Sequence, residues 1–183
     1  MHIVRGLVKA GVVLMLVCVA FQLLGCAPKY LEPEADVNQG AVQAQNEGDM
    51  SADEFRRVSN LGAVAQSGHS LSESDIDWLI SLANRPGTPH QQMTRLTFVS
   101  LSMSCCNKST VPTDRIGAVF NFAKELAAMS TTNGGQTGMF ACLIMKQVVG
   151  APAIPDLKAL ALSPNQYVRN MARHCLRKIA NGT

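Results

Sequence analysis

The sequence predicts an all-α protein whose folded part, residues 51–183, is a short α-solenoid of about three helical hairpins preceded by a capping helix. Apolar residues recur at three- and four-residue spacing through most of this region, as on one face of a helix. Residues that cap helices, and Pro and Gly residues that end them, stand between the apolar stretches. Equivalent apolar positions also recur about 40 residues apart, which is typical of stacked helical repeats.

Length and composition limit the classes of protein that fit. A chain of 183 residues has room for one ordinary domain with extensions. Hydrophobic residues make up 47% of it and aromatic residues 5%, so Ala, Leu, Val and Met must fill the core. Without residues 1–25, 14 basic residues face 13 acidic ones, a formal charge of +1. This balance argues against a general nucleic-acid binder, which needs a strongly basic face.

Residues 1–25 have the three parts of an export signal peptide. Arg5 and Lys9 supply the positive start, an apolar run of about fifteen residues follows, and small residues stand at its end. The run is shorter than the roughly 20 residues that a membrane-spanning helix needs. An uncleaved membrane helix is therefore the less favoured alternative.

The signal ends in a branched apolar residue, a tolerant position and a small residue, Leu23, Leu24 and Gly25, and Cys26 follows directly. This stretch resembles the lipobox of bacterial lipoproteins. The resemblance implies cleavage before Cys26, whose thiol would carry a diacylglycerol and whose freed amine a fatty acyl chain such as palmitate. Several acyl chains hold a protein on a membrane, whereas one anchors only reversibly. We expect no other cofactor.

The resemblance also implies a place in the bacterial cell envelope. Ala27 stands where, in enteric bacteria, an aspartate tends to retain lipoproteins in the inner membrane, so the outer membrane facing the periplasm is favoured. Residues 26–50 form the lipidated N-terminus and a linker. Positions 27–49 carry two prolines and five acidic residues with little to bury, which predicts a disordered tether.

Two helices are predicted after this tether. Ser51 and Glu54 fit a capping box for the first, and Ser72 can cap the second, whose first turn carries acidic residues that suit the helix dipole. The stretch from Arg85 to Gly87 would end the second helix. The predicted inward positions are Phe55, Val58, Leu61, Gly62 and Ala65 in the first helix and Ile76, Leu79, Ile80 and Ala83 in the second.

Two further helices are predicted beyond Pro112. Thr113 can cap the first, and the Asn and Gly residues at 133–135 would stop it. Its predicted inward positions are Ile116, Val119, Phe120 and Ala123. Residues 137–149 are apolar on almost every side, which indicates a buried helix.

Residues 93–104 allow two interpretations. Their apolar and polar residues alternate almost as well as they follow the helical period of 3.6 residues. Their Thr, Phe and Val residues also favour strands. We favour a helix, because the hairpin that begins near Ser72 needs its second helix there. A strand remains the alternative.

The last thirty residues divide into two helices at 163–165, and the second has an apolar stripe at helical spacing. The pattern resembles a short bacterial HEAT repeat, although 163–165 replaces the aspartate common in its turn. The residues that carry the resemblance are Ile154, Pro155, Leu157, Leu160, Val168, Arg169, Ala172 and Leu176. The resemblance implies that Arg169 bridges the turn and does not bind a partner.

Cys105, Cys106, Cys142 and Cys175 remain once Cys26 is acylated. An even number in an oxidising compartment allows one or two disulfides, although spacing cannot assign the pairs. The alternative is that cysteines such as Cys142 and Cys175 are small buried apolar residues. No metal site is expected, because the chain has no CxxC motif and its histidines are scattered.

Catalytic motifs are weak. Ser67, His69 and Ser70 place hydroxyls beside a histidine, but in a Gly-containing turn without a G-x-S-x-G elbow. Glu73 and Asp77 share one side of a helix, where a first-turn acidic pair ordinarily serves the dipole. We therefore do not expect an enzyme.

The strongest surface candidate for partner binding is basic, comprising Arg173, Arg177 and Lys178 near the C-terminus. Repulsion between like charges four residues apart and their attraction to the helix end are each a few tenths of a kcal/mol, so the two effects roughly cancel. The stripe can be a docking face for an acidic partner or anionic polymer, or a solvated face that closes the solenoid.

The sequence thus predicts a membrane-anchored lipoprotein whose repeat domain is a scaffold for an unidentified envelope protein. Helical repeats present long surfaces that suit this role. The alternative is an assembly or escort factor for an outer-membrane secretion or pilus component, with one dedicated client. An enzyme such as a hydrolase or lyase is the least favoured hypothesis.

Overall fold

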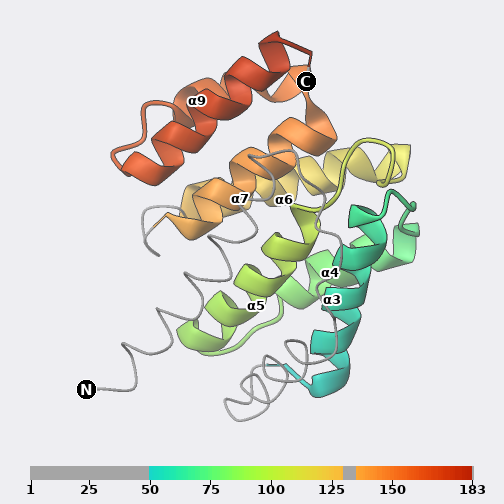
Figure 1. Cartoon of the computed structure of the whole chain (residues 1–183). Helices are drawn as coiled ribbons and strands as arrows, with labels where there is room; N and C mark the ends of the chain where they lie inside the picture. The colour runs from blue at the N-terminus through green and yellow to red at the C-terminus, as the bar shows by residue number, and fades with distance from the viewer. Residues whose placement is uncertain (1–49, 130–134, 183) are drawn as a thin grey trace. The chain divides into compact units, whose positions relative to one another are not determined.

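The structure, a computed structural model, describes residues 50–129 and 135–182. In these ranges the chain forms seven α-helices and no strand, so the all-α prediction is confirmed (Figure 1). Residues 1–49, which hold the expected signal peptide, Cys26 and most of the linker, lie outside the described residues. No helix of the described part is long and apolar enough to cross a membrane.

The elements follow one another with short connections. They are α3 (Ala52–Gln66), α4 (Glu73–Ala83), α5 (Pro89–Met103), the 3₁₀ turn η1 (Thr113–Arg115), α6 (Ile116–Ala128), α7 (Gln136–Ile144), the π-helical segment η3 (Met145–Val149), the 3₁₀ turn η4 (Ala151–Ala153), α8 (Ile154–Leu160) and α9 (Gln166–Ala180).

Capping side chains explain where four of the helices begin. In three of them the N-cap hydroxyl accepts from a backbone N–H three residues on, whose side chain accepts from the cap N–H in return. The pairs are Ser51–Glu54, Ser72–Asp75 and Thr88–Gln91. At α9, Asn165 Oδ1 accepts from the N–H groups of Tyr167 and Val168. The predicted Ser51 and Ser72 caps are confirmed, and the Thr88 cap was not predicted.

The predicted cap at Thr113 is wrong. Residues 113–115 form the 3₁₀ turn η1, and α6 begins at Ile116 with no side-chain cap. The inward face of α6 is also rotated from the one predicted. Val119 and Ala123 are buried as expected, but Phe122 and Leu126 complete the stripe, while Ile116 and Phe120 are half-buried at its edge. The Lys124 ammonium lies 4.2 Å from the centre of the Phe120 ring, a cation–π contact at this edge.

The ambiguous stretch 93–104 is helical and lies mostly within α5. Its hydroxyl groups form hydrogen bonds within the helix, because Thr97 and Ser100 donate to carbonyl oxygens four residues earlier. Ser102 Oγ instead reaches α3 and donates to Val58 O at 2.9 Å. The polar residues that imitated a strand pattern therefore bond within α5 or join it to α3.

The helices pack in pairs that follow the chain order. α4 packs with α5, α6 with α7, and α8 with α9. The second helices of these pairs also contact one another in sequence, α5 with α7 and α7 with α9, and α3 packs on α5 (Figure 1). α7 lies at the centre of these contacts, which explains why the stretch from Phe140 to Met145 is buried throughout.

Ion pairs add a second set of links between helices. Arg115, at the start of α6, pairs with Glu73 at 2.9 Å and with Asp77 at 3.0 Å, both on α4. The acidic pair attributed to the helix dipole thus also joins α4 to α6. Arg57 joins α3 to Asp75 of α4 in the same way, at 3.0 Å. Each exposed pair contributes about 1 kcal/mol at most, so the apolar core supplies most of the stability.

Candidate functional site

The predicted basic residues lie on the outer side of α9. Val168, Ala172 and Cys175 face the core and are fully buried. Arg173 and Arg177 are exposed on the other side, and Lys178 is half-buried. Within the described ranges, none of these three cations forms an ion pair; we call them the α9 basic face.

The distribution of charge makes this face unusual in the molecule. Residues 137–182 hold six basic residues and one acidic residue, Asp156. In the earlier helices, by contrast, cations meet carboxylates, as Arg85 does with Glu54 and Arg115 with Asp77. Positive charge is therefore concentrated around the last helices, where it raises the electrostatic potential felt by an approaching anion.

Lys146 adds to this concentration from another element. It lies half-buried in η3. Partial burial lowers the pKa of His174 on α9, and the charges of Lys178, Arg177 and Lys146 lower it further. Three cationic side chains from two elements, α9 and η3, thus act on His174. The sequence did not reveal Lys146 as a site residue, because it stands in an apolar stretch and only packing against α9 brings it there.

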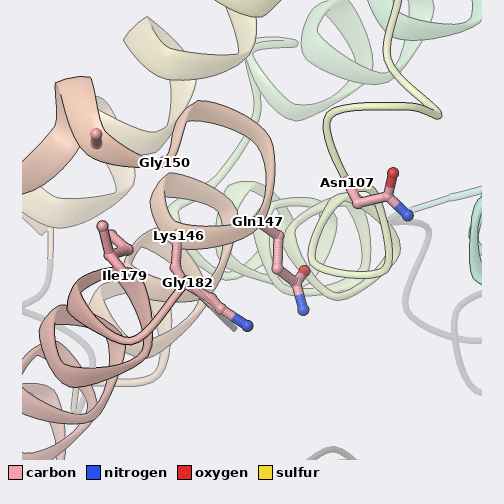
Figure 2. Close-up of a pocket in the computed structure, with 7 residues that line it drawn as sticks. Asn107, Lys146, Gln147, Gly150, Ile179 and Gly182 are labelled. Atoms are coloured by element: carbon pink, nitrogen blue, oxygen red, sulfur yellow. The ribbon is translucent and has the colours of Figure 1, made fainter.

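A cavity of about 430 Å³ lies beside Lys146. Figure 2 shows η3 with Lys146, Gln147 and Gly150 between the end of α9 and the α5–α6 connection that carries Asn107. Ile179 and Gly182 form the α9 side of the cavity. It is thus built from three separate segments.

Hydrogen bonds hold the α5–α6 connection against η3. The N–H of Lys108 donates to Gln147 O at 3.0 Å. The Gln147 side-chain amide, oriented by its hydrogen-bond partners, donates to the carbonyl oxygens of Ser104 and Cys106. These bonds hold this wall of the cavity against η3.

Arg169 is engaged in the fold, as the resemblance implied. Its Nη1 donates to Ser163 O at 2.7 Å and to Pro164 O at 3.3 Å, across the α8–α9 turn. Arg95 of α5 makes the same kind of contact, donating to Arg85 O and Pro86 O across the α4–α5 turn. Both arginines therefore hold turns, and Arg169 is not part of the α9 basic face.

Apolar side chains are exposed beside the same turn. Leu162 is 81% exposed and Tyr167 is 67% exposed, although both are large and apolar enough to be buried. They flank Pro164, which is also exposed. Tyrosine is one of the residue types that are enriched among the energetically dominant positions of protein contact surfaces.

The four predicted cysteines carry free thiols. Burial raises the pKa of Cys106 to about 12 and that of Cys175 to about 11. Burial also raises the pKa of Cys142, and the charge of Cys175 raises it further. Cys142 and Cys175 are thus neighbours across the contact of α7 with α9, and Cys105 is half-buried. Their disulfide pairing stays a prediction.

The Ser67 and His69 pair lies in an exposed turn after α3. Ser67 Oγ is 2.9 Å from His69 Nδ1, and Gly68 between them has φ +83°. Ser70 Oγ donates to Ser109 O, which joins this turn to the α5–α6 connection. The acidic neighbours Glu73 and Asp77 are engaged by Arg115. These contacts favour the interpretation of the motif as a turn.

Within the described ranges, no three His, Cys, Asp or Glu side chains gather where they could hold a metal ion. The α9 basic face and the cavity beside Lys146 are thus the candidate sites. Comparison of the chain with protein-family models, with curated proteins and with solved structures found no match.

Proposed function

We propose that the protein is a membrane-anchored lipoprotein whose HEAT-like helical domain is a scaffold for protein–protein interaction in the bacterial cell envelope. The α9 basic face carries the proposal, because Arg173, Arg177 and Lys178 have no ion-pair partner in the described part of the chain. Such a face fits the acidic surface of a partner protein. Electrostatic complementarity of this kind guides association and orients the two proteins.

Exposed apolar residues at the other end of α9 support a protein as the partner. Leu162 and Tyr167 stand exposed at the α8–α9 turn, at the N-terminal end of the helix that carries the cations. A protein partner can cover apolar side chains and pair with cations at once, as interfaces commonly do. The Tyr167 ring is a suitable anchor, because tyrosine is enriched among the residues that dominate binding energy.

The succession of helix pairs supports the scaffold role. In repeat proteins each unit contacts only its neighbours, and the stack presents an extended surface. The contacts of α3, α5, α7 and α9 follow this order. On this proposal the outer face of α9, where Arg173 and Arg177 are exposed, is available to a partner.

The proposed anchor is Cys26 with its lipobox, Leu23, Leu24 and Gly25. Lipid on Cys26 would hold the protein on the membrane, with the outer membrane facing the periplasm as the favoured location. The test is Cys26→Ser. We expect loss of lipid labelling and release from the membrane fraction, whereas unchanged membrane retention would show that the anchor is something else.

Crosslinking in native envelopes tests the partner. The wild type is expected to give a crosslinked partner that the double variant Arg173→Glu with Arg177→Glu loses. Lys158→Glu, a charge reversal at an exposed position of α8, is the control and should keep the crosslink. Retention of the crosslink by the double variant would show that the α9 basic face is not the contact. A single dominant client would favour the escort role.

A further inference from the structure

We propose that His174 takes part in binding at the α9 basic face, where a carboxylate of the acidic partner pairs with its protonated imidazole and the partner binds more tightly as the pH falls. This inference rests on the proposed function and deepens it, because it adds a residue and a pH dependence to the same face. It is carried by the position of His174 among cations and by the lack of an anion beside it in the described part of the chain.

His174 lies within the α9 basic face. It follows Arg173 directly, and Arg177 and Lys178 come three and four residues later, the spacing at which side chains on a helix are neighbours. Its side chain is half-buried, whereas Arg173 and Arg177 are exposed. Lys146 acts on it from η3, which packs against α9. A partner that pairs with these cations therefore comes within reach of the imidazole.

The elements that pack against α9 bring no free carboxylate to this place. They are α7, α8 and η3. Cys142 is the ionisable side chain of α7, and Lys146 is that of η3. α8 carries Asp156 and Lys158, but Asp156 faces Lys124 of α6 at 3.9 Å. The surroundings of His174 in the described ranges are therefore cationic or neutral.

His174 itself has no partner among the described residues, with which it forms neither a hydrogen bond nor an ion pair. A half-buried imidazole of this kind can donate from a ring nitrogen to an incoming oxygen. Once protonated, it can form a charge-assisted hydrogen bond with a carboxylate, which is stronger than a neutral one. An acidic partner would supply the missing anion.

The electrostatics link this contact to pH. Burial, and then the charges of Lys178, Arg177 and Lys146, lower the pKa of His174 below its ordinary value of 6.5, so the imidazole of the free protein is neutral at neutral pH. A carboxylate beside the ring has the opposite effect, because it favours the protonated form. The pKa of His174 is therefore higher in the complex than in the free protein. Affinity rises as the pH falls through the higher pKa, and the gain is complete below the lower one.

The test is calorimetric titration of the purified full-length protein with a peptide of alternating Asp and Ser residues, at about pH 7.5 and about pH 5.5. The Asp carboxylates stay ionised at both, since their ordinary pKa is about 3.9, so the charge of the probe hardly changes. We expect saturable binding that is about threefold or more tighter at the lower pH. Titrations near about pH 6 in two buffers of different ionisation enthalpy should also show uptake of protons on binding.

Three variants assign the effect to His174. His174→Gln should lose most of the pH dependence and of the proton uptake. His174→Arg is charged at both pH values, so it should bind the peptide with nearly equal affinity at both. His69→Gln is the matched control, because His69 lies in the exposed turn after α3, and it should keep the pH dependence of the wild type. Circular dichroism verifies each fold, and His174→Arg still tests the assignment if His174→Gln unfolds.

Three results would overturn this inference. They are absence of saturable binding by the wild type, equal affinity of the wild type at both pH values, and full retention of its pH dependence by His174→Gln. The double variant Arg173→Glu with Arg177→Glu should lose the peptide at both pH values, and unchanged binding by it would count against the inference too, because the probe would then lie elsewhere. The crosslink in native envelopes judges the scaffold role by itself. A crosslink lost in the double variant, together with an affinity independent of pH, would keep the proposed function and reject the role of His174.

Discussion

Ser102 of α5 lies directly against Gly62 of α3. A Cβ on Gly62 would be 3.0 Å from Ser102 Oγ and 3.3 Å from Ser102 Cα. Ser102 Oγ itself donates to Val58 O at 2.9 Å, so the two helices are joined by a hydrogen bond where they are closest. The missing side chain of Gly62 is what allows this approach.

Gly62→Leu should therefore lower the free energy of unfolding by about 1–3 kcal/mol, because an added side chain forces apart helices that are already in contact. Gly117→Leu is the matched control. Gly117 is exposed in α6 with no atom within 4 Å of an added Cβ, so the better helix propensity of leucine should stabilise by about 0.5–1 kcal/mol. Urea denaturation measures both, and equal effects of the two changes would contradict the close contact.

Arg95 should contribute more to stability than Arg169, although both bond the carbonyl oxygens of a turn. Arg95 is 3% exposed, whereas Arg169 is half-buried. Arg95→Met leaves the carbonyl oxygens of Arg85 and Pro86 without this donor and should cost about 2–3 kcal/mol. Arg169→Met should cost about 1 kcal/mol, because water replaces the lost donor. Equilibrium denaturation in urea gives the order, and the reverse order would contradict it.

The buried thiols should react slowly in the folded protein. The pKa of Cys106 is about 12 and that of Cys175 about 11, so few thiolates exist near pH 8. Iodoacetamide followed by peptide mass mapping should label Cys106, Cys142 and Cys175 only after urea is added. Residues that stay unlabelled in urea without a reductant would instead reveal a disulfide.

His174 should make stability fall as the pH drops below about 7. Burial and then the charges of Lys178, Arg177 and Lys146 lower its pKa below the ordinary value of 6.5. The unfolded chain thus binds a proton more readily, and stability is lost as pH falls from about 6.5 through the lower native pKa. His174→Gln should flatten this slope when unfolding in urea is followed at each pH. An unchanged slope would contradict the assignment.

Salt should modify the same slope. The cations near His174 act partly through solvent, so added salt screens them and brings its pKa nearer to the ordinary value.

Lowered pKa values of Glu54, bonded to Arg85, and Asp75, bonded to Ser72, make stability fall only below about pH 4.5. Measurements above pH 5 therefore exclude most of the contribution of these two carboxyls.

Local sequence was sufficient for the starts of α3 and α4 and for the apolar stripe of α9. Ser51 and Ser72 cap helices through contacts with residues three positions away, so the information lies within one turn. Val168 and Cys175 are buried as their spacing predicted. The wrong prediction at Thr113 also concerns a single turn. It arose because a 3₁₀ turn and the first turn of an α-helix need nearly the same residues.

The sequence by itself determined the helices and the basic character of α9, because caps, helical spacing and charge act over a few residues. Only the tertiary structure decided which residues meet. Lys146 acts on His174 because α7 and α9 pack together, and Asn107 lines the cavity beside Lys146 because hydrogen bonds tie its connection to η3. Such contacts join residues about 30–40 positions apart, and they form only when burial of the apolar faces brings distant helices together.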